Sequence, residues 1–395
     1  MKTKPLTQVC NITTGKLDAN AETPNGKYPF FTCAPDPLRI DTFSFDDDVI
    51  LLAGNNAQGN FHLQRYKGKF DAYQRTYVIT ARDGYDIDYI KCSLEQSLQH
   101  LKRIAQGSQT KFLTMQILDS FQVADIPYSD QKRLVGSIKE VENKIAINTK
   151  IVSILESMAK TLYDYWFVQF DFPDENGRPY RTSGGEMVWN AQLKREIPKG
   201  WKAGTVGQLG DVVSGGTPTT THEDYYCNQG IAWITPNDLS GNENKMFISH
   251  GERDITQSGL DNSSAVLMPK HSVLLSTRAP IGYLAISNNE ICTNQGFKSI
   301  VPNAGYHGYF IYYLLKRNVS AIAQQGVGTT FKEVSKDTLS NFAVPLPSKI
   351  LANNFAEKVT PLCEKRCVLE EENRELERLR DWLMPMLMNG QARVE

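Results

Sequence analysis

The chain has 395 residues, of which 41% are hydrophobic and 22% are charged, and its formal net charge is −1. This composition excludes an intrinsically disordered protein, and the absence of any run of about 18 apolar residues excludes an ordinary membrane-spanning helix. A length near 400 residues favours two or three domains. Because the net charge is close to zero, positive charge for binding nucleic acid has to be arranged locally or supplied by a partner.

The N-terminus and the cysteines favour a cytoplasmic protein. The segment Met1–Pro5 leads into polar sequence without an apolar signal core. The seven cysteines show no paired C-x-x-C spacing and no nearby histidine pair, which predicts reduced thiols and no metal site.

Residues 1–125 form the first predicted domain. Bases alternate with aromatic residues in Arg65–Phe70 and Tyr73–Tyr77, a pattern that suits contact with phosphates and bases. A strand pair with Phe70, Tyr73 and Tyr77 inward and the charges in water is the alternative. Amides in the turn Gly54–Gly59 are of the type that reads adenine. The candidate DNA contacts here are Lys16, Asn55, Asn56, Gln58, Arg65, Lys67, Lys69, Gln74, Arg75, Thr110 and Lys111.

Residues 126–170 are predicted as a central spacer helix, regular from about Ser129 to Phe167. Apolar residues recur at alternating steps of four and three, which is a coiled-coil pattern. Asn148 interrupts the seam and either fixes its register or faces a solvated gap. The predicted interface residues are Leu134, Ile138, Val141, Ile145, Asn148, Leu155 and Leu162.

A Gly-, Pro- and Asp-rich linker over residues 171–189 leads into a second predicted domain, residues 190–347. The small-residue turn Ser214–Thr221 offers backbone amides and hydroxyls to a phosphate, or is an ordinary loop. Arginine pairs with guanine and Asn or Gln with adenine. The candidate DNA contacts here are Ser214, Gly215, Gly216, Thr217, Thr219, Thr220, Arg278, Asn294, Gln295, Lys298, Thr329 and Thr330.

Residues 348–395 are predicted as a second spacer helix, with Leu362, Leu369, Leu376 and Leu383 at every seventh position. Arg366, Asn373 and Arg380 interrupt the other row of its seam, which predicts a narrow apolar stripe, and the run Glu370–Glu372 predicts a solvated face. Two antiparallel helices of about 35 to 40 residues would extend roughly 50 to 60 Å.

The chain also repeats itself at a separation of about 221 residues. Gln74 falls on Gln295, Ile79 on Ile300 and Phe121 on Phe342. We therefore predict a mixed α/β (α+β) fold of two similar globular domains joined by two long antiparallel coiled-coil helices with pseudo-two-fold symmetry. Two equivalent domains on a stiff spacer suit a ligand with two sites at fixed separation, such as duplex DNA.

The machinery of an enzyme is missing from the sequence. There is no Gly-rich dinucleotide loop and no phosphate-loop lysine. The nuclease-like spacing of Glu142 and Lys144 lies inside the predicted helix, and Ile234–Asp238 only superficially resembles an adenine methyltransferase motif. The sequence predicts no catalytic residue.

With these features the chain resembles the specificity subunits of type I restriction-modification enzymes over nearly its whole length. In the first domain the resemblance is carried by Thr14–Asn20, Gly26–Phe31, Ile50–Gly54 and Tyr73–Tyr77. In the second it is carried by Ile197–Trp201, Leu209–Asp211, Ser214–Pro218, Trp233–Leu239 and Asn294–Phe297. The first domain departs from the pattern, because it starts without the Pro-x-Gly-Trp lead-in of Ile197–Trp201.

The resemblance implies a non-catalytic subunit of the bacterial or archaeal cytoplasm that reads one half of a split DNA target with each domain. Its helices would set the gap and dock two methyltransferase subunits, and restriction subunits would join them. S-adenosylmethionine, ATP and Mg²⁺ would be bound by those partners and no cofactor by this chain. The alternatives are a two-headed scaffold for protein or glycan ligands and a self-sufficient modification enzyme.

Overall fold

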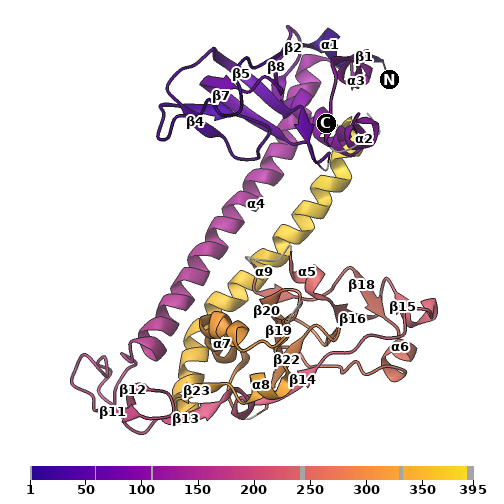
Figure 1. Cartoon of the computed structure of the whole chain (residues 1–395). Helices are drawn as coiled ribbons and strands as arrows, with labels where there is room; N and C mark the ends of the chain where they lie inside the picture. The colour runs from indigo at the N-terminus through magenta and orange to yellow at the C-terminus, as the bar shows by residue number, and fades with distance from the viewer. Residues whose placement is uncertain are drawn as a thin grey trace. The chain divides into compact units, whose positions relative to one another are not determined.

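The computed structural model describes residues 2–57, 59–107, 110–240, 245–303, 305–328 and 332–388. By their internal contacts the residues divide into a first unit, Met1–Ala146 with Arg374–Glu395, and a second unit, Ile147–Asn373. The boundary between the units falls within both long helices, so each unit contains one part of each helix (Figure 1). The predicted residues Gln58, Thr329 and Thr330 lie outside the described residues.

The first unit is a sheet covered by helices (Figure 1). Its main sheet has the strand order β2-β8-β5-β7-β3-β4, and β1 pairs separately with β10. The elements are β1 (Thr3–Pro5), α1 (Leu6–Val9), β2 (Cys10–Thr14), β3 (Tyr28–Phe31), β4 (Leu38–Ile40), β5 (Phe45–Ala53), β6 (Asn55–Asn56), β7 (Leu63–Ala72), β8 (Thr76–Ala81), α2 (Ile87–Ile104), β9 (Lys111–Phe112), α3 (Met115–Ser120), β10 (Gln122–Ala124) and the first half of α4 (Tyr128–Tyr163).

Strand β5 is buried on both faces, as its continuous apolar run Val49–Ala53 predicts. Ile50 and Leu52 belong to a core cluster with residues of α2, while Val49 and Leu51 belong to a cluster on the other side of the sheet. The alternation follows from the two-residue period of a strand. The first of these clusters also takes in Leu134, Val135 and Ile138 of α4 and Leu387 and Met388 of α9 (Lys349–Met388).

The two larger sheets of the second unit have the strand orders β14-β22-β19-β20-β17 and β15-β18-β16-β21, and β11-β12 and β13-β23 are separate pairs. Its elements are the end of α4, the π-helical turn η1 (Asp164–Val168), β11 (Met187–Asn190), β12 (Arg195–Pro198), β13 (Lys202–Thr205), η2 (Val206–Gln208), β14 (Gly210–Ser214), η3 (Glu223–Tyr225), β15 (Tyr226–Cys227), β16 (Ile231–Ile234), α5 (Pro236–Ser240), β17 (Phe247–Ile248), β18 (Arg253–Ile255), α6 (Gln257–Asp261), β19 (Val273–Thr277), β20 (Ile281–Ser287), β21 (Cys292–Thr293), β22 (Lys298–Pro302), α7 (Gly308–Gln324), α8 (Lys336–Ser340), β23 (Ala343–Leu346) and the first half of α9.

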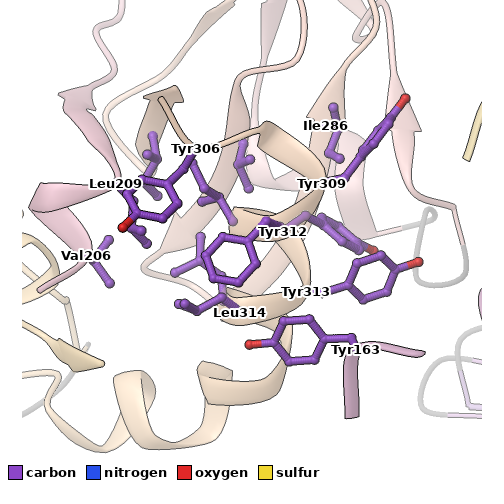
Figure 2. Packing of buried hydrophobic residues seen from close by; sticks show 14 of the residues in the cluster. Tyr163, Val206, Leu209, Ile286, Tyr306, Tyr309, Tyr312, Tyr313 and Leu314 are labelled. Carbon is purple, nitrogen blue, oxygen red and sulfur yellow. The ribbon is translucent and has the colours of Figure 1, made fainter. Parts of the chain in front are cut away.

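Helix α7 is the centre of the second core. Every residue from Gly308 to Leu315 is buried, because the helix packs against the sheet on one side and against the long helices on another. Figure 2 shows Tyr306, Tyr309, Tyr312 and Tyr313 around this helix, with Tyr163 of α4 beside Tyr313. The first two turns of α7 are apolar on all sides, which is typical of a fully buried segment, whereas Lys316 and Arg317 in the next turn are exposed.

The predicted duplication is confirmed by the topology. In each unit a short strand pair closes the domain, β1 with β10 and β13 with β23, and both pairs are antiparallel. The strand order β2-β8-β5-β7 corresponds to β14-β22-β19-β20, and α2 and α3 correspond to α7 and α8. Ile79 pairs with Ile50 as Ile300 pairs with Val273, which agrees with the sequence alignment of the two copies.

The two long helices are present as predicted, with 36 residues in α4 and 40 in α9. In the second unit they run antiparallel, because Asn148 donates from Nδ2 to Glu372 (2.8 Å) while Glu156, further along α4, pairs with the earlier Arg366 of α9. Asn148 is only 1% exposed, so the solvated-gap interpretation is wrong. The predicted seam residues Val141, Ile145, Leu155, Leu162, Leu362, Leu376 and Leu383 are partly buried, and Leu134, Ile138 and Leu369 are buried.

One prediction about α9 is wrong: Glu370, predicted in a solvated face, is 3% exposed. Arg366 and Asn373, which interrupt the apolar row, are buried as well, so the packed face of α9 includes polar side chains. The reason is a chain of polar contacts: Arg366 donates from Nε to Glu370 (2.5 Å) and also pairs with Glu156. Buried charges are retained where they are paired in this way.

The network continues to both neighbouring elements. Glu370 accepts the backbone amides of Met246 (2.9 Å) and Phe247 (3.0 Å), so α9 holds the start of β17. Glu156 accepts from Lys316 Nζ (2.6 Å) and from the Tyr313 hydroxyl (3.1 Å), so α4 holds α7. Every charge in the chain of contacts therefore has a partner.

The acid stability of the chain should depend on Glu156. Burial alone would raise the pKa of its carboxyl, but the charges of Arg366 and Lys316 and the bond from Tyr313 hold that pKa below its usual value. A carboxyl with a lowered pKa stabilises the fold above its unfolded pKa of about 4.3, and this contribution is lost as the pH falls through the folded pKa. We expect urea titrations between pH 6 and 3 to show a steeper loss of stability in the wild type than in Glu156→Gln. Equal slopes would contradict this assignment.

Among the described residues no helix is long and apolar enough to cross a membrane. All seven cysteines are free thiols.

Candidate nucleic-acid interface

Four segments of the first unit meet at one end of its main sheet. The Gly15 amide donates to Thr76 O (3.3 Å), the Gly54 amide to Arg75 O (2.9 Å) and the Leu113 amide to Gly54 O (2.8 Å). These bonds join the turn after β2, the segment after β5, the β7–β8 turn and the segment after α2. We call this set of segments the first loop cluster.

Most of the residues predicted to contact DNA in the first domain lie in this cluster. Asn55 and Asn56 pair with Phe112 and Lys111 in the β6–β9 ladder. Gln74 donates from Nε2 to Asp18 (2.9 Å), while Lys16, Arg75 and Thr110 are exposed. A cleft between the segments is lined by Thr14, Gly54, Gln74, Arg75, Tyr77, Phe112 and Leu113. The structure therefore brings together residues from four separate parts of the sequence.

The second unit repeats the arrangement. The Gly215 amide donates to Phe297 O (3.4 Å), the Thr277 amide to Gly296 O (2.8 Å) and the Val334 amide to Thr277 O (3.0 Å). These are the counterparts of the three bonds in the first unit, in the same order. The segments around Gly215, Thr277, Gly296 and Val334 form the second loop cluster.

The side chains of the two clusters also correspond. The backbone of Arg278 forms an antiparallel β-bridge with Glu333, just as Asn55 pairs with Phe112 in the β6–β9 ladder. Asn55 and Arg278 therefore occupy equivalent positions. Thr217 hydrogen-bonds to Gln295, as Asp18 does to Gln74. The predicted Ser214, Thr217 and Asn294 are partly exposed, and Thr219, Thr220 and Gln295 are exposed. Each cluster thus presents amide groups together with one or more arginines.

Two predicted features of the second cluster need correction. The amides of Gly215 and Gly216 donate to Phe297 O and Thr293 O, so they are not available to a phosphate. Lys298 is 8% exposed and pairs with Glu333 (3.2 Å), which anchors the loop that follows α7. Both features stabilise the shape of the cluster, and the hydroxyls of Thr219 and Thr220 remain exposed for contact with a ligand.

The basic and aromatic patch of β7 lies outside the cluster. Lys67 and Lys69 are exposed, but their cross-strand neighbours are Asp48 and Asp46 of β5, so acidic residues offset the positive charge of the patch. Arg65 is paired with Asp48 and with Asp88 (2.9 Å). Phe70 and Tyr77 are buried and Tyr73 is partly buried, in agreement with the strand-pair alternative.

In each cluster one glycine, Gly15 or Gly215, lies so close to a neighbouring backbone segment that a side chain would not fit. A Cβ on Gly15 would stand 1.9 Å from Ala72 O, and one on Gly215 would stand 2.0 Å from Asn294 O. We expect Gly15→Ala and Gly215→Ala each to lower the free energy of unfolding by about 1–3 kcal/mol, because the backbone has to shift. Gly136→Ala is the control: nothing lies within 4 Å of its Cβ, and alanine favours a helix. Urea denaturation measures all three, and wild-type stability of Gly15→Ala would refute the close approach.

One exposed surface, on α4, was not predicted from the sequence. Ile147, Ile151, Ile154 and Met158 of α4 are all exposed, at 57%, 36%, 51% and 52%. Their spacing of four, three and four residues places them on one helix face, beside the predicted seam. The same periodicity would have identified this exposed apolar stripe in the sequence. No group of three or more metal-ligating side chains occurs among the described residues.

The fold and the paired loop clusters define a protein that carries the same candidate binding site twice. The family model for the type I restriction modification DNA specificity domain matches residues 1–157 and 198–377. The chain belongs to this family: it is a specificity subunit of a type I restriction-modification system.

Similar proteins agree with this assignment. The MjaIX specificity subunit of Methanocaldococcus jannaschii is 38% identical over 166 residues, which are 40% of this chain and 38% of that protein. The HindI specificity subunit of Haemophilus influenzae is 23% identical over 349 residues, 75% of each chain. The crystal structure of the S subunit of a type I system from M. genitalium has the same fold, with a TM-score of 0.65 and 14% identity over 98% of this chain and 96% of that one.

Proposed function

We propose that this subunit selects a bipartite duplex DNA target, reading one half with each loop cluster, and that it performs no chemistry itself. The observation that carries the proposal is the equivalence of the clusters, in which Asn55 and Gln74 of the first correspond to Arg278 and Gln295 of the second. These residue types read base edges in the major groove. Different residues at equivalent positions would give the two half-sites different sequences.

A map of methylated adenines across the genome tests this function. The map is compared between cells with and without this chain, in the presence of the neighbouring methyltransferase. Loss of methylation at one split motif is the expected result, and the motif gives both half-sites and their gap. Identical maps, with the methyltransferase shown to be active with another specificity subunit, would overturn the proposal.

The two half-sites should respond to different substitutions. We expect Arg278→Ala to weaken binding to the cognate duplex by about 1–3 kcal/mol and to relax selectivity in one half-site only. Asn55→Ala should have the same effect on the other half-site. Lys270→Ala is the control, because this exposed lysine lies outside the clusters and is not a predicted DNA contact. Competition between duplexes with single base changes measures the effect, and relaxation of both halves by one substitution would contradict separate reading.

The proposal includes partner subunits that carry the chemistry. Two methyltransferase subunits would dock on the helices and bind S-adenosylmethionine, and restriction subunits would bring ATP and Mg²⁺. The exposed apolar stripe on α4 supports docking, because contiguous apolar surface on a folded protein marks an interaction site. An antiparallel helix pair with such a stripe suits the addition of partner helices.

A further inference from the structure

The second unit contains a cavity that the recognition function does not use. Two adjoining hollows share Tyr163, Val168, Arg317 and Ser320, and the larger part of one wall is formed by residues of α7. Arg195 of β12 and the aromatic rings of Trp201 and Phe310 line the same space. The π-helical turn η1 interrupts the end of α4 at this point, and such turns are frequent at functional sites.

Two arginines face this cavity without an acidic partner among the described residues. Arg195 lies over the ring of Phe170, 5.2 Å from its centroid. Burial lowers the pKa of Arg195, and the positive charge of the nearby Arg317 lowers it further. The carboxylates in the neighbourhood are already paired: Asp164 with Lys160 (2.5 Å) and Glu156 with Lys316 (2.6 Å). The cavity therefore concentrates positive charge.

Tyr163 adds a hydrogen-bond donor. The residue is 6% exposed, lines both hollows and packs its ring against Tyr313 at 6.0 Å between centroids (Figure 2). Within the described part of the chain its hydroxyl forms no hydrogen bond, and it is not among the fully buried oxygens, so it is accessible to a ligand in the cavity. Burial and the charge of Asp164 raise the pKa of Tyr163, while the charges of Arg195 and Arg317 oppose the shift, so the phenol stays protonated.

We propose that the cavity binds a phosphate group between Arg195, Arg317 and the hydroxyl of Tyr163. Guanidinium groups match the geometry of phosphate oxygens, and two of them balance a doubly charged phosphate. A tetrahedral anion also offers an additional oxygen to the tyrosine. The aromatic wall of Trp201 and Phe310 suits a sugar or base attached to that phosphate. The phosphate belongs either to a free nucleotide or to a DNA backbone. Binding of a free nucleotide is independent of the proposed function, whereas binding of a DNA backbone rests on the proposed function.

Calorimetric titration of the full chain with inorganic phosphate and with AMP, at constant ionic strength, tests the free-nucleotide source. We expect binding to the wild type, at least about tenfold weaker binding to the double variant Arg195→Gln/Arg317→Gln, and a few-fold loss in Tyr163→Phe. Both arginines are exposed at the rim of the cavity, so the double variant should fold. Lys270→Gln, which removes one exposed charge elsewhere in the same unit and outside the loop cluster, should bind as the wild type does.

Duplex DNA tests the second source. If the phosphate belongs to the backbone, the double variant should reduce the slope of log affinity against log salt by about 1 to 2 relative to the wild type, for target and non-target duplexes alike. Lys270→Gln should leave the slope unchanged. If the wild type binds neither phosphate nor AMP and the double variant has the wild-type salt slope, the site does not bind phosphate. A third result would also overturn this proposal: the double variant loses target selectivity but keeps the wild-type salt slope, and the wild type does not bind phosphate. The two arginines would then act on the loop clusters instead.

Discussion

Replacement of Arg366 by methionine is expected to lower the free energy of unfolding by about 3–5 kcal/mol, because it leaves buried carboxylates without their counter-charge. Arg366 is 3% exposed and pairs with Glu156 and with Glu370. Methionine fills much of the volume of the arginine stem, so the loss would come from the charge and not from a cavity. Urea denaturation, followed by far-ultraviolet circular dichroism, measures the change.

The control is Lys365→Met, one position earlier on the same helix. Lys365 is exposed, so its replacement should change stability by no more than about 0.5 kcal/mol. Adding Glu156→Gln and Glu370→Gln to Arg366→Met should recover part of the loss, since both side chains become neutral. The substituted side chain of Glu370→Gln also keeps an oxygen that can accept the amides of Met246 and Phe247. If Arg366→Met and Lys365→Met were equally stable, the buried network would have no energetic role.

The sequence predicted the features that depend on periodicity and repetition. The heptads of α4 and α9, the duplication of the domain and the correspondence of Gln74 with Gln295 all follow from spacings along the chain. The clustering of the candidate contacts was only partly predictable. Duplication indicates that the same segments meet in both domains, but the bonds from Gly54 to Arg75 and from Leu113 to Gly54 are set by the fold.

Contacts between residues that lie far apart in the sequence were not predicted, and the reason is physical. Glu370 sits in a run of three glutamates, which normally predicts a solvated face, but its partners are the amides of residues 246 and 247. Lys298 looked like a DNA contact by its type, but the fold places it beside Glu333. Arg195 and Arg317 come from separate elements and line the same cavity as Tyr163. No local pattern carries such information, because burial and pairing depend on the tertiary arrangement.

The second large effect is expected on the exposed stripe of α4. Ile154→Asp should weaken the association of the chain with the proposed methyltransferase subunits by at least about 2 kcal/mol, roughly 30-fold, because it would place a charge at the centre of the proposed apolar contact. Ile154 is 51% exposed, so the substitution should leave the stability of the free chain nearly unchanged. Association is measured by titrating labelled chain with the purified methyltransferase, and stability by urea denaturation of the same variant.

Ser153→Asp provides the matched control, because it introduces the same charge at the neighbouring exposed position, outside the stripe. Successive residues of a helix point in directions about 100° apart, so the two aspartates face different surroundings. Equal association of both variants would show that the stripe is not the docking surface. Loss of association in Ile154→Asp alone would mean that the seam residues hold the two helices to each other while the adjacent stripe holds the partner. The same helix would then present two apolar rows for two different purposes.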